Sequence, residues 1–159
     1  MPDVFALLSD DHRTVEALFQ QYAQSPDPAV AQRICDELTI HAVVGEELMY
    51  PLLASKVKMA LAEEARREHE EAKGLITQIE AGVGAGRDIG DLVAALEKAV
   101  RHHVQEEESQ VFPAMREVLP SLTAEMGDDV VLRRQELHEQ MAEVRSGGQS
   151  AAVVGHKLL

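Results

Sequence analysis

Apolar residues recur every three or four positions along most of the chain, which is the spacing of one buried face of an α-helix. No segment alternates strictly between apolar and polar residues, as a half-buried strand would. Two stretches rich in turn-forming residues, "SPDP" at positions 25–28 and "GVGAG" at 82–86, interrupt the helical pattern. The pattern therefore predicts an all-α protein.

Turn signals and prolines divide the chain into five predicted helices. We expect four long helices over about residues 3–24, 28–55, 57–81 and 89–118, followed by a shorter fifth helix over about 129–145. Asp27 can cap the second helix with Pro28 in its first turn, and Pro51 and Pro113 should bend the ends of the second and fourth helices. Residues 1–145 are predicted to form one domain, and residues 146–159 a flexible tail.

Four long helices joined by short turns pack by default into an antiparallel up-down bundle, so their apolar stripes should face a common axis. On the second helix the stripe continues after its histidine with Gly45, Leu48 and Leu52, and on the fourth with Glu107, Val111 and Ala114. We expect four imidazoles at one level of the bundle interior, because each stripe has a histidine near its middle: His12, His41, His69 and His103.

The composition fits a single helical core and restricts the partners. The 159 residues suffice for one domain, and aromatic residues make up only 3%, so aliphatic side chains must fill most of the core. The formal net charge of −13 argues against binding to nucleic acid or to an anionic membrane surface. Cys35 is the only cysteine and the chain shows no signal segment, so we expect a cytoplasmic protein without an internal disulfide.

Four inward histidines are unusual because core packing does not require an imidazole on every helix. One such histidine alone is more often a hydrogen-bonded core residue, but four buried together would each need a polar partner. A transition metal such as iron solves this problem because neutral imidazole is a good metal ligand. Glu107 follows His103 by four residues and therefore lies on the same helix face, where its carboxylate could bridge two ions.

The segments that begin with His41 and His103 are near-copies of each other. Residues 41–51 read "HAVVGEELMYP" and residues 103–113 read "HVQEEESQVFP", and both segments end in an aromatic residue and a proline. The residue four positions after the histidine is Glu107 in the second copy but Gly45 in the first, where Glu46 comes one position later. The first copy thus lacks the carboxylate that the second one provides.

Four segments taken together resemble the hemerythrin-like, or HHE cation-binding, family: "DDHRTVEALF" at 10–19, "HAVVGEELMYP" at 41–51, "REHEEAKGLI" at 67–76 and "HHVQEEESQVFP" at 102–113. The resemblance implies a four-helix bundle with a non-heme site for two iron ions, which binds oxygen or reacts with nitric oxide or peroxide. By position, it also implies a set of metal ligands: His12, His41, His69, His103 and Glu107.

Gly45 departs from the family pattern, which expects a bridging Glu there, and Lys73 stands where the pattern expects a fifth imidazole. Glu46 could supply the missing carboxylate if a π-bulge next to Gly45 shifted it, and Glu16 could supply it from the face of His12. An oxo or hydroxo bridge between two iron ions would then have to balance part of their charge. The alternatives are a site for one ion, iron or zinc, that binds or senses without turnover, and a bundle without metal.

Overall fold

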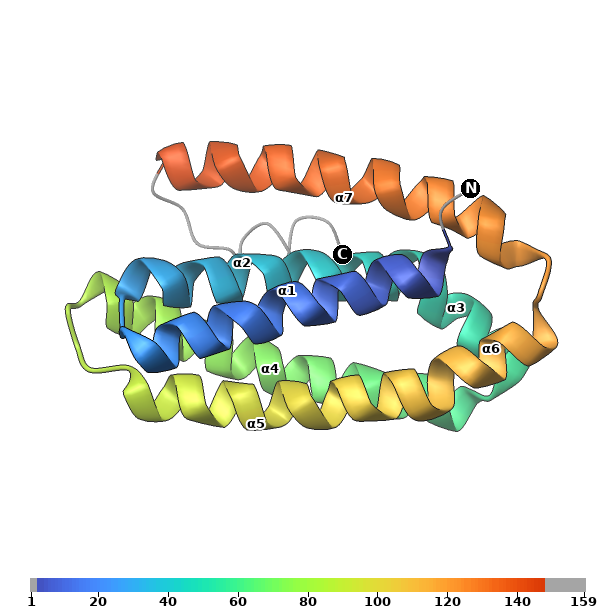
Figure 1. Cartoon of the computed structure of the whole chain (residues 1–159), viewed down its shortest axis with the longest axis horizontal. Helices are drawn as coiled ribbons and strands as arrows, with labels where there is room; N and C mark the ends of the chain where they lie inside the picture. The colour runs from blue at the N-terminus through green and yellow to red at the C-terminus, as the bar shows by residue number, and fades with distance from the viewer. Residues whose placement is uncertain (1–2, 148–159) are drawn as a thin grey trace.

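The computed structural model describes residues 3–147, except for the side chains of residues 122–124. Four long helices lie side by side, with successive ones running in opposite directions, and a fifth long helix lies outside them (Figure 1). The described residues contain no strand, so the predicted all-α bundle is confirmed. The five long helices are α1 (Val4–Gln24), α2 (Pro28–Val44), α4 (Met59–Gly84), α5 (Gly90–Glu106) and α7 (Leu122–Gly147).

Short polar residues begin the first two helices. The Asp3 carboxylate accepts hydrogen bonds from the backbone amides of Phe5 at 2.8 Å and Ala6 at 3.3 Å, which satisfies two amides that have no partner within α1. Asp27 accepts from the amide of Ala29 at 2.9 Å, with proline in the first turn of α2 as the sequence predicted. These caps fix where the chain enters the bundle.

Three π-helical turns interrupt the bundle helices. They are η1 (Gly45–Met49), η2 (Leu53–Val57) and η3 (Glu107–Val111), and the short helices α3 (Tyr50–Leu52) and α6 (Phe112–Val118) follow η1 and η3. Pro51 and Pro113 are the second residues after η1 and η3, and each lacks the amide hydrogen that a regular α-helix would use. The predicted π-bulge beside Gly45 is therefore present, and an equivalent turn occurs in the second copy of the repeated segment.

The fifth helix is longer than the sequence predicted. It begins at Leu122 and spans 26 residues, as many as α4, so the expected shorter helix over 129–145 is wrong. Met126, Val130, Leu137 and Met141 are buried along it, and this burial offsets the cost of Gly127 within the first half of the helix. Of the predicted tail, residues 146 and 147 belong to α7, and the others lie outside the described residues.

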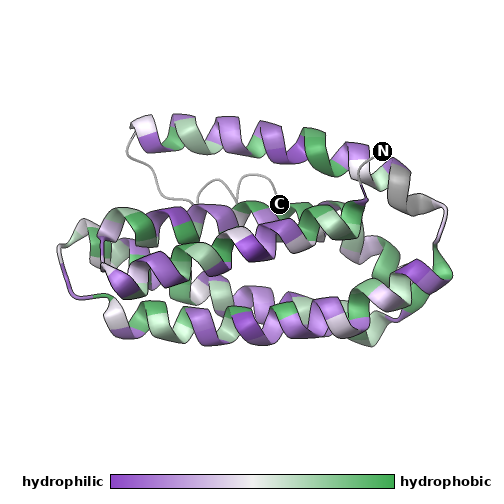
Figure 2. Ribbon diagram, in the orientation of Figure 1, coloured by the Kyte–Doolittle hydropathy of each residue, from purple (hydrophilic) through white to green (hydrophobic). Residues whose placement is uncertain are grey.

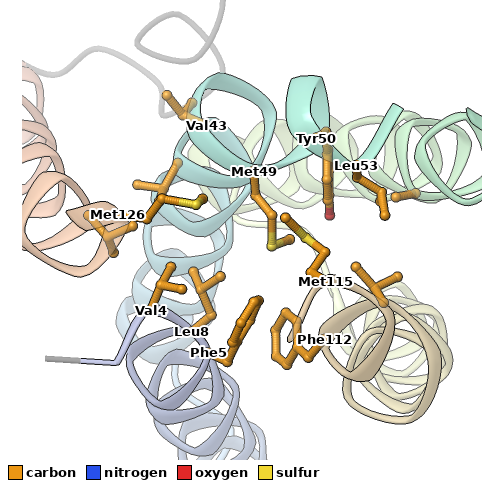
Figure 3. Packing of buried hydrophobic residues seen from close by; sticks show 14 of the residues in the cluster. Val4, Phe5, Leu8, Val43, Met49, Tyr50, Leu53, Phe112, Met115 and Met126 are labelled. Carbon is orange, nitrogen blue, oxygen red and sulfur yellow. The ribbon is translucent and has the colours of Figure 1, made fainter. Parts of the chain in front are cut away.

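Two apolar clusters occupy the two ends of the bundle. One contains Phe5, Phe112, Met49 and Met115, and the rings of Phe5 and Phe112 have centroids 5.1 Å apart (Figure 3). The other is mainly aliphatic, with Val15, Leu18, Phe19, Ile34, Ile76 and Leu96 among its members. Figure 2 shows hydrophilic and hydrophobic residues alternating around the long helices, as expected for amphipathic elements. Within the described part of the chain, every helix is too short or too polar to cross a bilayer.

Candidate metal centre

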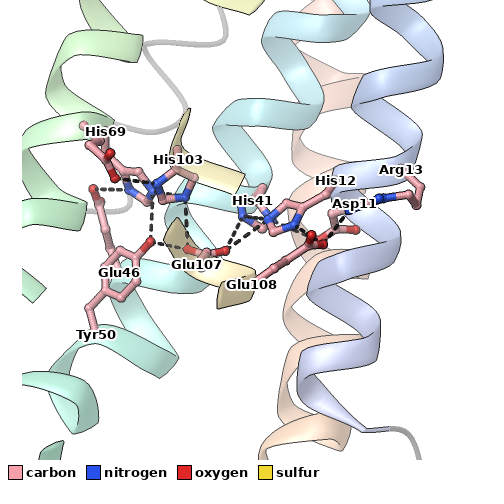
Figure 4. Close-up of polar contacts among 11 residues, drawn as sticks. Asp11, His12, Arg13, His41, Glu46, Tyr50, His69, His103, Glu107 and Glu108 are labelled. Atoms are coloured by element: carbon pink, nitrogen blue, oxygen red, sulfur yellow. Dashed lines mark hydrogen bonds and ion pairs between the residues drawn. The ribbon is translucent and has the colours of Figure 1, made fainter. Parts of the chain in front are cut away.

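The Glu107 carboxylate lies between the two apolar clusters and has contacts on both of its oxygens. The residue is 1% exposed and begins η3, one turn after His103. Its Oε1 lies 3.0 Å from Nε2 of His12 and 3.4 Å from Nε2 of His41. Its Oε2 lies 3.0 Å from Nε2 of His103 and accepts a hydrogen bond from the Tyr50 hydroxyl at 2.8 Å. Each oxygen of one buried carboxylate thus faces a different group of side chains (Figure 4).

The four predicted histidines form two pairs on opposite sides of this carboxylate. His12 of α1 and His41 of α2 approach with their Nε2 atoms 3.2 Å apart, and His69 of α4 and His103 of α5 with theirs 3.4 Å apart. Each pair, together with Glu107, offers three ligand atoms that lie within 4.8 Å of one another. Each half could therefore hold a metal ion between two imidazoles and a shared carboxylate.

The outer nitrogen of every one of these histidines meets a carboxylate. The Nδ1–oxygen distances are 3.2 Å for His12 and Glu108, 3.3 Å for His41 and Asp11, 3.1 Å for His69 and Glu46, and 3.0 Å for His103 and Glu68. A carboxylate that accepts the Nδ1–H bond leaves the Nε2 lone pair free and fixes the orientation of the ring. All four imidazoles therefore direct Nε2 to the centre, where the neutral ring would offer its lone pair to a metal.

Basic side chains contact these carboxylates in turn. Arg13 contacts Glu108 at 2.5 Å, Arg134 contacts Asp11 at 2.5 Å, Lys73 contacts Glu46 at 3.5 Å, and His102 contacts Glu68 at 3.2 Å. These partners stand between the buried centre and solvent, because each basic side chain is more exposed than the carboxylate that it contacts. The centre is thus enclosed by two successive layers of polar contacts.

The two halves of the site repeat the same arrangement. In each half, the acidic residue directly before the first histidine contacts the outer nitrogen of the second histidine of that half. The acidic residue at the second position of the π turn contacts the outer nitrogen of a histidine in the other half. Glu46 is therefore the counterpart of Glu108, and Gly45 is the counterpart of Glu107. The first half consists of Asp11, His12, His41, Gly45 and Glu46. The second half consists of Glu68, His69, His103, Glu107 and Glu108.

Tyr50 occupies the space that Gly45 leaves beside the centre. A Cβ atom on Gly45 would lie 3.5 Å from Cζ of Tyr50 and 3.6 Å from its hydroxyl oxygen. This hydroxyl also lies 3.1 Å from Nε2 of His69, and the residue is fully buried. In the second half the counterpart of Tyr50 is Phe112, whose ring stacks on His12 instead. One half thus combines glutamate with phenylalanine, and the other combines glycine with tyrosine.

Neither carboxylate that the sequence offered as a replacement lies at the vacated position. Glu16 is exposed on α1, where its carboxylate lies 3.8 Å from Arg13, so the expectation that it faces the centre is wrong. Glu46 does turn toward the site through the π turn, but it meets the outer nitrogen of His69 rather than the interior. Lys73, at the position of the family's fifth imidazole, pairs with Glu46 and Glu70.

The charges of the centre depend on one another. Burial by itself would raise the pKa of Glu107, but His103, His12 and His41 more than offset this effect and hold the pKa well below its usual value. Burial would likewise lower the pKa of His103 and His41, yet Glu107 and the outer carboxylates raise these pKa values to about 10 and about 9. Metal ions would compete with the protons on these two imidazoles for the same nitrogen atoms.

Two other groups of the centre have pKa shifts that favour their neutral forms. Burial lowers the pKa of His69 despite its contact with Glu46, and burial and the nearby Glu107 raise the pKa of the Tyr50 hydroxyl well above its usual value. Tyr50 therefore contributes a hydrogen-bond donor without adding charge. The exchange of a bridging glutamate for tyrosine removes one negative charge from the centre.

Several residues of the site were not identified from the sequence. Asp11 and Glu68 each directly precede a predicted histidine ligand, and Glu108 directly follows Glu107. Tyr50 aligns with Phe112 in the repeated segments, so the comparison of the two copies that marked Gly45 could also have marked Tyr50. The helical period could not have done so, because the π turn changes which residues face inward.

Known proteins share this sequence pattern and this fold. The sequence matches the Hemerythrin HHE cation binding domain over residues 3–115 and again over residues 64–147. A DNA nickase from Nostoc sp. (strain PCC 7120 / SAG 25.82 / UTEX 2576) is 36% identical over 115 residues, which are 70% of this chain and 33% of that protein. The match thus spans one third of the relative's length.

A solved structure has the same architecture. The crystal structure of a Hemerythrin HHE cation binding domain-containing protein from Mycobacterium kansasii superimposes with a TM-score of 0.79. It is 22% identical, and the match covers 98% of this chain and 99% of that one, so the fold is shared over essentially the whole length. Together with the match to the family over most of the sequence, the clustered histidines and Glu107 show that this chain belongs to the hemerythrin HHE cation-binding domain family.

Proposed function

We propose that the chain binds two iron ions, one in each histidine pair, and that this centre binds or reacts with a small oxidant such as oxygen, nitric oxide or peroxide. The observation that carries the proposal is that the two oxygens of Glu107 face different histidine pairs, at 3.0 Å from His12 and from His103. A buried carboxylate in this position can bridge two ions, as in other bundle proteins with paired metals. When bound, iron supplies the redox chemistry.

The side chains of the chain itself have separable roles in this proposal. The four histidines and Glu107 hold the metal, and the outer carboxylates orient the imidazole rings. Tyr50 places a hydroxyl group 2.8 Å from Glu107 and 3.1 Å from His69, so it can donate a hydrogen bond inside the centre. Apolar side chains pack in two clusters toward the two ends of the bundle, with the site between them.

A second candidate function is a module that holds one ion, iron or zinc, and senses or binds it without turnover. The replacement of a carboxylate by Gly45 and Tyr50 favours it, because two ions facing a single carboxylate leave more positive charge uncompensated. An absorption spectrum and oxidant consumption distinguish the two candidates. Iron-loaded protein that absorbs in the visible range and consumes peroxide or nitric oxide supports the paired centre, whereas colourless, inert protein with one zinc ion supports the module.

We do not extend DNA nicking from the Nostoc relative to this chain. That activity belongs to a longer protein, of which the match spans only one third, and the net charge of −13 opposes contacts with phosphate. We expect no measurable binding to duplex DNA at physiological salt in an electrophoretic shift or fluorescence titration. Saturable binding there would contradict this expectation. The single cysteine is consistent with a proposed role in the reducing cytoplasm.

A further inference from the structure

A large cavity that is open to solvent on one side adjoins the histidines on the side of the aliphatic cluster. Its volume is about 620 Å³, and the imidazoles of all four helices form part of its wall. Most of the remaining wall is aliphatic, with contributions from α1, α2, α4 and α5. The aliphatic part includes Val15, Leu38, Ala42, Ala72, Ile76 and Val100.

Small side chains create this cavity. Ala72 and Val100 lie on inward stripes one turn from their histidines, where a bundle normally places large side chains. Both remain partly exposed although they face the interior, and Ala42 and Ala99 leave further space beside them. Protein interiors are normally densely packed and contain few voids larger than a water molecule, so this cavity is much larger than an ordinary packing defect.

The cavity is far larger than a diatomic ligand or peroxide requires. A water molecule takes up about 30 Å³ of the liquid, and small oxidants are of comparable size. Pockets of roughly 300–1,000 Å³ with mainly apolar walls are typical of sites for organic molecules of drug-like size. The cavity therefore has room for an organic body beside the metal centre.

The charges around the cavity favour an uncharged ligand. Lys73 is the only cationic side chain in the described wall apart from the histidines, and it is already paired with Glu46 at 3.5 Å and Glu70 at 3.1 Å. Asp11 and Glu68 also line the wall, so an anionic ligand would meet further carboxylates. Outside the histidine cluster, an anionic ligand would therefore lose its hydration without gaining a free cationic partner.

We propose that the cavity binds an uncharged organic molecule with an apolar body and a single hydroxyl or hydroperoxyl group, which is directed at the histidine cluster. The apolar body lies along the aliphatic wall, and the oxygen-bearing group reaches the imidazoles and the centre. Exposed Thr77 and Glu70 mark the side of α4 on which the cavity meets solvent. This inference rests on the proposed function, because it names an organic substrate class for the same metal centre.

Calorimetric titration of the iron-loaded and the metal-free protein with cumyl alcohol tests the proposal. We expect saturable binding to the iron-loaded protein, and at least a tenfold loss of affinity in Ala72→Phe, whose ring would fill part of the cavity. Ala94→Phe is the matched control because Ala94 is exposed on α5, and it should bind like the unchanged protein. Ala99→Phe, which changes another wall residue, replaces Ala72→Phe if that variant does not fold.

The metal content and the alcohol titration separate the two proposals. Iron bound without any saturable binding of cumyl alcohol overturns the organic-ligand proposal and leaves the metal proposal standing. Saturable binding that Ala72→Phe and Ala99→Phe do not weaken also overturns it, because the ligand then sits elsewhere. Binding that both variants abolish in a protein that retains no metal supports the cavity as a ligand site, while the paired metal centre fails.

Discussion

Gly45 and Tyr50 act as a pair at the scale of single residues. The tyrosine hydroxyl fills the space next to the glycine and donates to Glu107, whereas the matching half of the site combines Glu107 with Phe112. A Cβ atom at position 45 would lie in ordinary contact with Tyr50, 3.5 Å from Cζ and 3.6 Å from the hydroxyl oxygen, so the rest of a glutamate side chain would compete with this hydroxyl for space beside the centre. Substitutions at both positions together should therefore lower the free energy of unfolding by less than the sum of their separate effects.

A double-mutant cycle on Gly45→Glu and Tyr50→Phe tests this pairing. We expect Gly45→Glu alone to lower the free energy of unfolding by about 1–3 kcal/mol, because it overfills a packed interior. Gly45→Glu with Tyr50→Phe reproduces the combination of the other half and should recover part of this loss. Urea unfolding of the metal-free proteins gives the four values, and additive effects of the two substitutions would contradict the pairing.

At the scale of elements, the π turns limit how far along each helix the sequence could predict which residues face inward. Up to each turn the helical period holds, so His12, His41, His69, His103 and Glu107 were all predicted to face one level, and all lie there. Beyond η1 the inward positions shift by one residue: Met49 and Leu53 are buried where Leu48 and Leu52 were expected. Beyond η3, Met115 is buried where Ala114 was expected.

This shift explains why Tyr50 could not be placed from the period. A π turn adds one residue to a helical turn, and the hydrogen bonds that select it depend on Pro51 and on the surrounding packing. The fold class and the histidine level depend only on periodicity and could be predicted. The start of α7 could not, because burial of Met126 and Val130 against the bundle overrides the helix-breaking tendency of Gly127.

The beginning of α1 offers a test of an element boundary. Asp3 caps the helix and also contacts Arg116 of α6 at 2.8 Å. Asp3→Ala should lower the free energy of unfolding by about 1 kcal/mol through loss of the cap, whereas Asp3→Asn keeps the cap and should cost only a few tenths. Thermal unfolding of the two variants compares these effects, and equal melting temperatures would show that the cap contributes nothing.

The contribution of the Asp3 charge should depend on pH. Burial alone would raise the pKa of Asp3, but Arg116 and the amides of Phe5 and Ala6 more than offset it and lower the pKa. A lowered pKa in the folded state contributes stability above the unfolded value of about 4, and this stability is lost as the pH falls through the folded value. The difference between the unchanged protein and Asp3→Asn should therefore shrink in acid.

At the scale of the whole molecule, α7 connects the outside of the bundle to the metal centre. It packs on α1 and α2 (Figure 1), and Arg134 contacts Asp11, which in turn holds the outer nitrogen of His41. The neighbouring Arg133 contacts Glu47 at 2.7 Å, which has no contact with the four histidines among the described interactions. Of these two adjacent arginines, Arg133 therefore attaches α7 to the bundle away from the histidines, whereas Arg134 supports a residue of the site.

Replacing these arginines one at a time tests whether α7 supports metal binding. Arg134→Gln should weaken metal affinity by about tenfold, because contacts behind a metal ligand orient it. Arg133→Gln removes a similar ion pair from the same helix and should leave affinity unchanged. Competition with a coloured chelator measures both, and equal metal release from the two variants would show that Asp11 needs no support from α7.

The metal content per chain tests the central claim most directly. Purified protein loaded with ferrous iron and freed of excess metal should retain two ions per chain, and Glu107→Gln should reduce this number because it removes the carboxylate shared by both halves. Glu16→Gln, a surface change on α1, should retain two ions. Retention of one ion or none by the unchanged protein, or of two ions by Glu107→Gln, would contradict a paired metal centre built on Glu107.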